Sequence, residues 1–165
     1  MIQVRYLAVY LNDHLAGATA AHELVKRAVS SNEGTEYGEF LTELEHEIAE
    51  DRATLVHLME RFDVAQDKLK LTGAFIGEKL GRLKPNAHLL SYSPLSRVVE
   101  LEVLGLGIEG KLSLWRALLD MEHADERLDP EELQTLVDRA QAQRRQLEPH
   151  RLRAVEEALL QAAEA

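Results

Sequence analysis

Residues 36–62 read EYGEFLTELEHEIAEDRATLVHLMERF. Apolar residues recur in this stretch at alternating spacings of four and three, and these spacings return the chain to one face of an α-helix. The positions on that face are Tyr37, Leu41, Leu44, Ile48, Asp51, Leu55, Leu58 and Phe62. The pattern predicts a long amphipathic helix whose apolar face packs against other helices.

The same kind of periodicity predicts a helix before this stretch and another well after it. The first helix is expected over Val4–Val29, and it ends at the polar cluster of residues 30–34. The third is expected from Pro94 to about Leu119, because proline suits the first helical turn and Ser93 suits the N-cap. No stretch shows the alternation that is typical of a β-strand.

A fourth helix has the strongest start signal in the chain. Asp129 is placed to cap it and Pro130 stands at the first helical position. The helix is expected to run to about Leu147. Pro149 then kinks it or begins a new segment over residues 149–165, because proline removes a backbone donor and clashes with the preceding turn.

The segment between the second and third helices, residues 66–92, is too long for a hairpin loop and too apolar for a disordered linker. We expect a long crossover with a short helix in it, linking two helices that run in the same direction. Residues 66–84 carry five basic and two acidic side chains. They either pack flat across the bundle with their lysines in solvent, or meet an anionic membrane surface or an acidic partner.

Composition indicates one domain, residues 1–165, with 19 Lys and Arg against 29 Asp and Glu and no cysteine. A net charge of −10 argues against nucleic-acid binding, which needs a basic surface. The lack of cysteine excludes disulfides, thiolate metal sites and cysteine nucleophiles. No apolar run is long enough to span a bilayer or to form a signal peptide, so we expect a cytoplasmic protein without stable membrane insertion.

Four ionisable residues lie where apolar residues are expected. Asp51 occupies the apolar face of the second helix, and His14 lies on the inward face of the first. Glu102 and Glu109 are seven residues apart, so about two turns and about 10 Å separate them along one face of the third helix. These carboxylates share that face with apolar residues, and we expect them to face inward.

Two interpretations of these four residues remain open. They converge in the bundle and hold a metal ion or a proton, or they are paired with cations or reach solvent at the bundle ends. The cations considered as partners are Arg52, Arg97, Arg116 and Lys111.

The order of helices, with a long crossover between the second and third, resembles the ferritin-like superfamily along most of the chain. Metal-binding members of that superfamily carry a Glu from each of two helices and a Glu-x-x-His pair from each of the other two. Glu43 and His46 have that spacing, but they face outward when Leu41, Leu44 and Ile48 face inward. The resemblance implies a ferritin-like four-helix bundle without the di-iron motif.

We therefore expect a non-enzymatic, all-α bundle without a cofactor that acts through protein–protein contacts, as a homodimer or with another protein partner. No nucleophile and base are spaced for catalysis. The alternative is an Fe- or Mn-dependent oxidase or metal-binding protein that uses His14, Asp51, Glu102 and Glu109.

Overall fold

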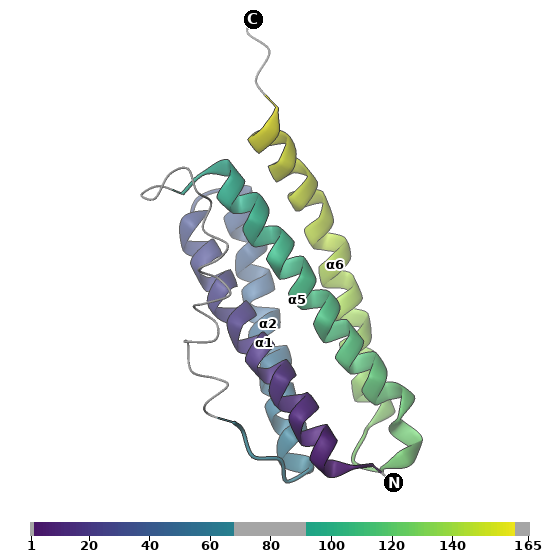
Figure 1. Cartoon of the computed structure of the whole chain (residues 1–165). Coiled ribbons are helices and arrows are strands. Elements are labelled where there is room, and N and C mark those ends of the chain that lie inside the picture. Colours follow the sequence, from purple (N-terminus) through teal and green to yellow (C-terminus); the bar gives the residue numbers. More distant parts are fainter. Residues whose placement is uncertain (1, 68–91, 161–165) are drawn as a thin grey trace, which may run out of the picture.

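A computed structural model describes residues 2–67 and 92–160 of the chain. This part is all-helical and contains no strand, which confirms the predicted all-α class. It forms a bundle of four long helices with one short 3₁₀ turn (Figure 1). The elements are α1 (Val4–Ser31), α2 (Glu36–Arg61), α5 (Pro94–Asp120), η1 (Glu122–Ala124) and α6 (Pro130–Leu159).

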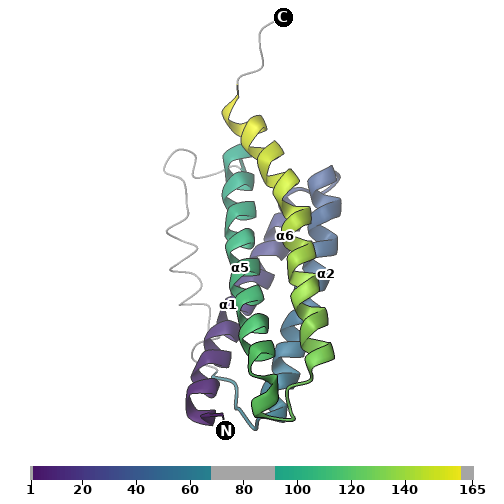
Figure 2. The ribbon, with the colours of Figure 1, turned by 90° about the vertical axis from the view of Figure 1, so that its right-hand side faces the viewer.

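Figure 2 shows the four helices side by side, and ion pairs between them indicate their directions. Helix α6 runs antiparallel to α2, because Arg153 pairs with Glu36 at one end and Arg61 pairs with Glu132 at the other. It also runs antiparallel to α5, because its C-terminal residue Glu157 pairs with an arginine near the start of α5. Helices α2 and α5 therefore run in the same direction.

The predicted crossover between α2 and α5 lies almost entirely in residues 68–91, outside the described residues, and so does most of the basic stretch 66–84. Both remain predictions. No helix in the described ranges is long and apolar enough to cross a membrane.

The predicted starts of the third and fourth helices are confirmed. The Ser93 side chain accepts a hydrogen bond from the Ser96 amide, and the Ser93 amide donates one to the Ser96 hydroxyl, forming a capping box. The Asp129 carboxylate accepts hydrogen bonds from the amides of Glu131 and Glu132. These contacts satisfy backbone donors that have no partner inside the helix.

The predicted end of the fourth helix is wrong, because α6 continues through Pro149 to Leu159. Pro149 has no amide hydrogen to donate to the carbonyl four residues earlier, but contacts on both sides of it hold the helix against its neighbours. Leu147 and Ala154 are buried in the core, and Arg151 reaches Glu102 of α5. Tertiary packing therefore outweighs the local cost of the proline.

The core consists of two apolar clusters. One surrounds Trp115 and contains Leu11, Leu58 and Leu136, toward the N-terminal end of α1. The other includes Leu41, Leu101, Leu147 and the neighbouring apolar side chains of all four helices. Between the two clusters the interior is polar.

Candidate functional site

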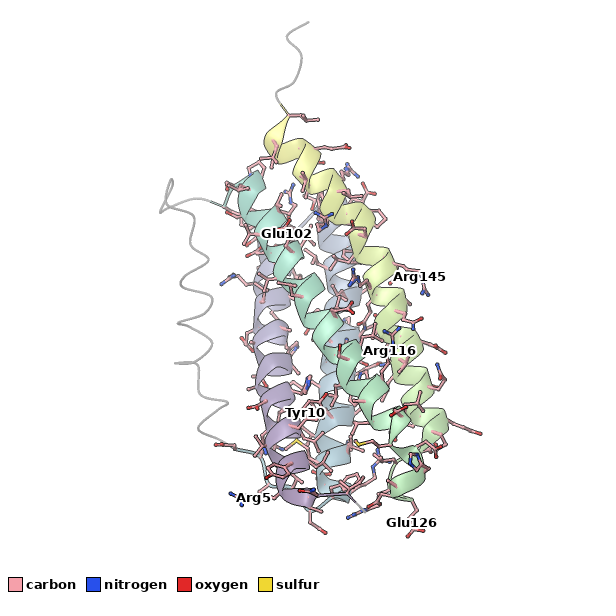
Figure 3. The ribbon with its side chains drawn as sticks, turned by 45° about the vertical axis from the view of Figure 1, so that its right-hand side comes forward. Arg5, Tyr10, Glu102, Arg116, Glu126 and Arg145 are labelled. Carbon is pink, nitrogen blue, oxygen red and sulfur yellow. The ribbon has the colours of Figure 1, made fainter. Side chains whose placement is uncertain are left out.

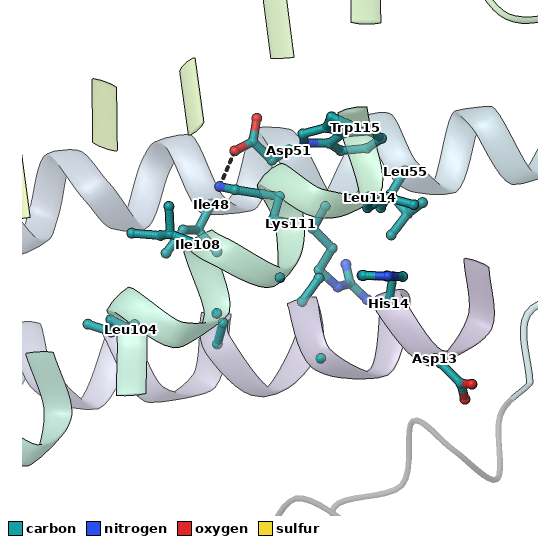
Figure 4. Close-up of a pocket in the computed structure, with 16 residues that line it drawn as sticks. Asp13, His14, Ile48, Asp51, Leu55, Leu104, Ile108, Lys111, Leu114 and Trp115 are labelled. Atoms are coloured by element: carbon teal, nitrogen blue, oxygen red, sulfur yellow. Dashed lines mark hydrogen bonds and ion pairs between the residues drawn. The ribbon is translucent and has the colours of Figure 1, made fainter. Parts of the chain in front are cut away.

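The polar layer between the clusters is built by Asp51 of α2, Lys111 of α5 and Gln143 of α6. The Lys111 ammonium donates to Asp51 Oδ2 over 2.5 Å and to Gln143 Oε1 over 2.5 Å (Figure 4 draws the first contact). The Gln143 amide donates to Asp51 Oδ2 over 3.3 Å. Each of the three side chains thus contacts the other two.

Further polar groups surround this triad toward α6 and α2. Arg139 donates to Asp51 Oδ1 over 3.1 Å and to Glu50 over 3.0 Å. The Gln143 amide also donates to Glu47 over 2.8 Å. Both oxygens of the Asp51 carboxylate therefore accept hydrogen bonds from cations.

Burial makes this layer energetically sensitive. Asp51 is 2% exposed and Gln143 is 0% exposed. Burial lowers the pKa of Lys111 below its ordinary value of 10.5, and the nearby Asp51 carboxylate opposes that shift. Leaving a buried carboxylate without any cation costs several kcal/mol. The cations around Asp51 are therefore needed for the stability of the fold.

Beside this layer, a cavity of about 170 Å³ lies between α1, α2 and α5. Its walls are mostly aliphatic, and they also include polar side chains (Figure 4). The aliphatic lining residues are Ile48, Leu55, Leu104, Ile108 and Leu114, and the polar ones include His14, Asp51, Arg52 and Lys111.

The cavity exists because small residues face each other across α1 and α5. Gly17, Ala18 and Ala21 line it from α1, and Gly107 and Gly110 line it from α5. A Cβ atom at Gly17 or Gly110 would meet nothing within 4 Å. Larger side chains at these glycine and alanine positions would fill the space between α1 and α5.

His14 lines this cavity, as expected of an inward residue, but it does not lie in a cluster of carboxylates. Its ring packs against the Tyr10 ring in a T-shaped arrangement, with a centroid distance of 4.6 Å. Burial lowers the pKa of His14 below its ordinary value of 6.5, and Asp13 opposes this shift. The imidazole is therefore neutral at neutral pH.

The prediction that Glu102 and Glu109 face inward is wrong. Their side chains are 51% and 47% exposed, and they pair with Arg151 and Arg144 of α6 (Figure 3 labels Glu102). Helix α5 is apolar on two faces, so its sequence allowed two rotations about its axis. The buried face is the one with Leu101, while Leu106 on the glutamate face is 74% exposed.

The sequence interpretation missed Gln143, the most buried polar residue of the layer. Its spacing carries a signal, since it lies three residues after Ala140 and four before Leu147 on the buried face of α6. Lys111 was among the cations considered as partners, and it does pair with Asp51. Arg139, the second cation on Asp51, was not considered.

A second polar cluster, also missed, joins the start of α5 to the end of α1. Tyr92 donates to Glu100 over 3.0 Å and accepts from Asn32 over 2.8 Å. Arg27 donates to Glu100, and Arg97 donates to Asn32. Burial, the largest cause, and the Glu100 carboxylate raise the pKa of Tyr92 to about 12. This cluster therefore stabilises one end of the bundle.

In the described ranges, no three histidine or carboxylate side chains gather as metal ligands would. The structure does not bring the four sequence candidates together: Asp51, Glu102 and Glu109 meet cations, and His14 meets an aromatic ring. No family model, curated protein or solved structure matches the chain. The side chains themselves therefore carry the functional argument.

Proposed function

We propose that the protein is a non-catalytic helical bundle that acts through protein–protein contacts, in the first place with a second copy of itself. The observation that carries this proposal is an apolar groove at the N-terminal end of α1. The groove is lined by Ile2, Gln3, Tyr6, Leu7, Tyr10, Met121 and Ala124.

The groove has the composition of an interface core. Tyrosine and methionine are enriched in such cores, whereas charged residues are depleted there. Tyr6 is 68% exposed, and Val9, also exposed, extends the same face of α1. Ile2, Tyr6 and Val9 follow one another at spacings of four and three, the spacing by which one helix packs along another.

A second copy is the occupant that this pattern favours. A two-fold symmetric dimer uses the same surface patch on both subunits, so a single apolar helix face satisfies both sides of the contact. Packing two such faces together removes the exposed tyrosine and valine side chains from water.

The pairing of the buried Asp51 carboxylate also supports a non-catalytic role. Asp51 is held by Lys111 and Arg139, so its oxygens are already occupied by donors. The ferritin-like assignment is part of the same proposal. The shared direction of α2 and α5 supports it, because that topology requires a crossover between those helices.

Sedimentation analysis of three full-length proteins tests the proposal. The wild type is expected to be a dimer, and the double variant Tyr6→Ser/Val9→Ser is expected to be a monomer with unchanged helical circular dichroism. Leu106→Ser removes an equally exposed apolar side chain from α5 and is expected to stay dimeric.

A monomeric wild type at every concentration would contradict self-association. A Leu106→Ser monomer beside a dimeric double variant would move the interface to the outer face of α5.

A further inference from the structure

The cavity between α1, α2 and α5 has the size of a small ligand. Its volume is about 170 Å³. An apolar cavity of about 150 Å³ in an engineered protein binds benzene. One six-membered ring with a small substituent therefore matches the space.

The charge of the lining indicates which substituent fits. Arg52 lines the cavity, and its Nε donates to Thr19 over 3.1 Å. Within the described ranges, Arg52 has no acidic partner. Guanidinium groups bind carboxylates through two parallel hydrogen bonds, so Arg52 provides a site for a carboxylate.

The other ionisable side chains that line the cavity do not neutralise the positive charge of Arg52. The charge of Lys111 is balanced by Asp51. His14 is neutral at neutral pH, because burial lowers its pKa. Figure 4 shows the Asp13 carboxylate pointing away from the other labelled residues. Arg52 is then the charge that a ligand meets in the cavity.

Trp115 adds a second, independent observation. It lines the cavity and is 1% exposed, and its indole Nε1–H has no acceptor among the described residues. Buried donors are nearly always satisfied in proteins, so this N–H is an open donor on a residue of the cavity wall.

From these observations we infer that the cavity binds a small organic monocarboxylate of about the size of benzoate. Its ring lies against Ile48, Leu104 and Ile108, and its carboxylate faces Arg52. The cavity and the apolar groove at the N-terminal end of α1 share no lining residue, so this inference does not depend on the dimer proposed above.

Titration of the full-length protein with benzoate tests this inference. Trp115 is the chain's single tryptophan, so its fluorescence reports on the cavity wall directly, and calorimetry provides a second readout. We expect saturable binding to the wild type. Arg52→Gln is expected to weaken binding at least about tenfold, as for the loss of a charge-assisted contact. Arg145→Gln, an exposed arginine on α6, is expected to leave it unchanged.

A filled cavity gives a further test. Ala18→Leu places a larger side chain in the cavity and is expected to abolish benzoate binding. Ala53→Leu makes the same change at an exposed position of α2 outside the cavity and is expected to bind normally. Circular dichroism of both variants establishes that they are folded.

Two results would overturn the inference. One is the absence of saturable benzoate binding to the folded wild type. The other is equal binding of benzyl alcohol with no dependence on Arg52, which would assign the cavity to neutral apolar molecules.

Discussion

Asp51 is the buried charged residue at the centre of the polar layer. It lies between the two apolar clusters and receives hydrogen bonds from α5 and α6. A buried ion pair adds little net stability compared with an apolar pair of the same shape, but its loss on one side leaves a charge without compensation. The layer therefore favours the one register of helices in which all its partners meet.

Replacing Lys111 with methionine is expected to destabilise the protein by about 2–3 kcal/mol, because the buried Asp51 carboxylate loses its closest cation and keeps only Arg139. Urea unfolding followed by circular dichroism measures the change. Arg144→Met breaks the exposed pair with Glu109 and is expected to cost at most about 1 kcal/mol. Equal effects of the two substitutions would mean that Arg139 alone compensates the charge of Asp51.

His14 is expected to make the stability depend on pH. Its folded-state pKa lies below the ordinary value of 6.5, so the unfolded chain takes up a proton first as the pH falls. Protonation of the unfolded state then lowers the free energy of unfolding below about pH 6.5.

Urea unfolding at about pH 7.5 and about pH 5.5 measures this effect. The wild type should lose more stability between the two values than His14→Gln does. His46→Gln, which removes an exposed imidazole from α2, is measured in parallel. An identical loss in wild type and His14→Gln would exclude a contribution from His14.

At the scale of single elements, α5 differs most from its neighbours. Its apolar residues cover two faces, and the polar contacts of Glu102 and Glu109 hold one of these faces toward α6 and solvent. On the side toward α1, Gly107 and Gly110 leave room for the cavity. The same helix thus contributes to the core, the polar layer and the cavity.

Substitutions of glycine by alanine are expected to have opposite effects in α5 and α2. Gly110→Ala should stabilise the protein by about 0.5–1 kcal/mol, because the new methyl group meets open space and alanine favours the helix. Gly38→Ala should destabilise it, because the methyl group would collide with the backbone carbonyl of Asn32. Thermal unfolding of both variants measures the two signs, and a stabilising Gly38→Ala would contradict the packing of the turn.

At the scale of the whole molecule, the net charge of −10 opposes the association of two copies. The groove that we propose as the dimer interface is apolar. Salt should therefore weaken the electrostatic repulsion between the two acidic copies more than it changes the apolar contact between them. Raising the salt concentration from about 0.1 M to about 1 M shortens the screening length from about 10 Å to about 3 Å.

We therefore expect the dimer to become several-fold tighter over that range of salt, as measured by sedimentation equilibrium. The Tyr6→Ser/Val9→Ser variant, measured under the same conditions, should remain monomeric. A dimer that weakens with salt would indicate that ion pairs hold it together.

The sequence by itself determined the helical class, the starts of the third and fourth helices and the inward direction of Asp51. These follow from local rules. Apolar spacing sets the buried face where only one face is apolar, and Ser93 and Asp129 satisfy the backbone donors of the residues just after them. Such interactions lie within one helix, so they can be recognised without the rest of the molecule.

Only the tertiary structure decided the rotation of α5, the continuation of α6 beyond Pro149 and the partners of Asp51. Helix α5 has two apolar faces, and the choice between them depends on which neighbours pack against it. Pro149 is tolerated because α5 holds the helix on both sides of it. Lys111 and Gln143 lie 60 and 92 residues from Asp51, so the contacts among them depend on how α2, α5 and α6 align. The cavity is likewise a property of facing helices, because small residues leave space only where other small residues oppose them.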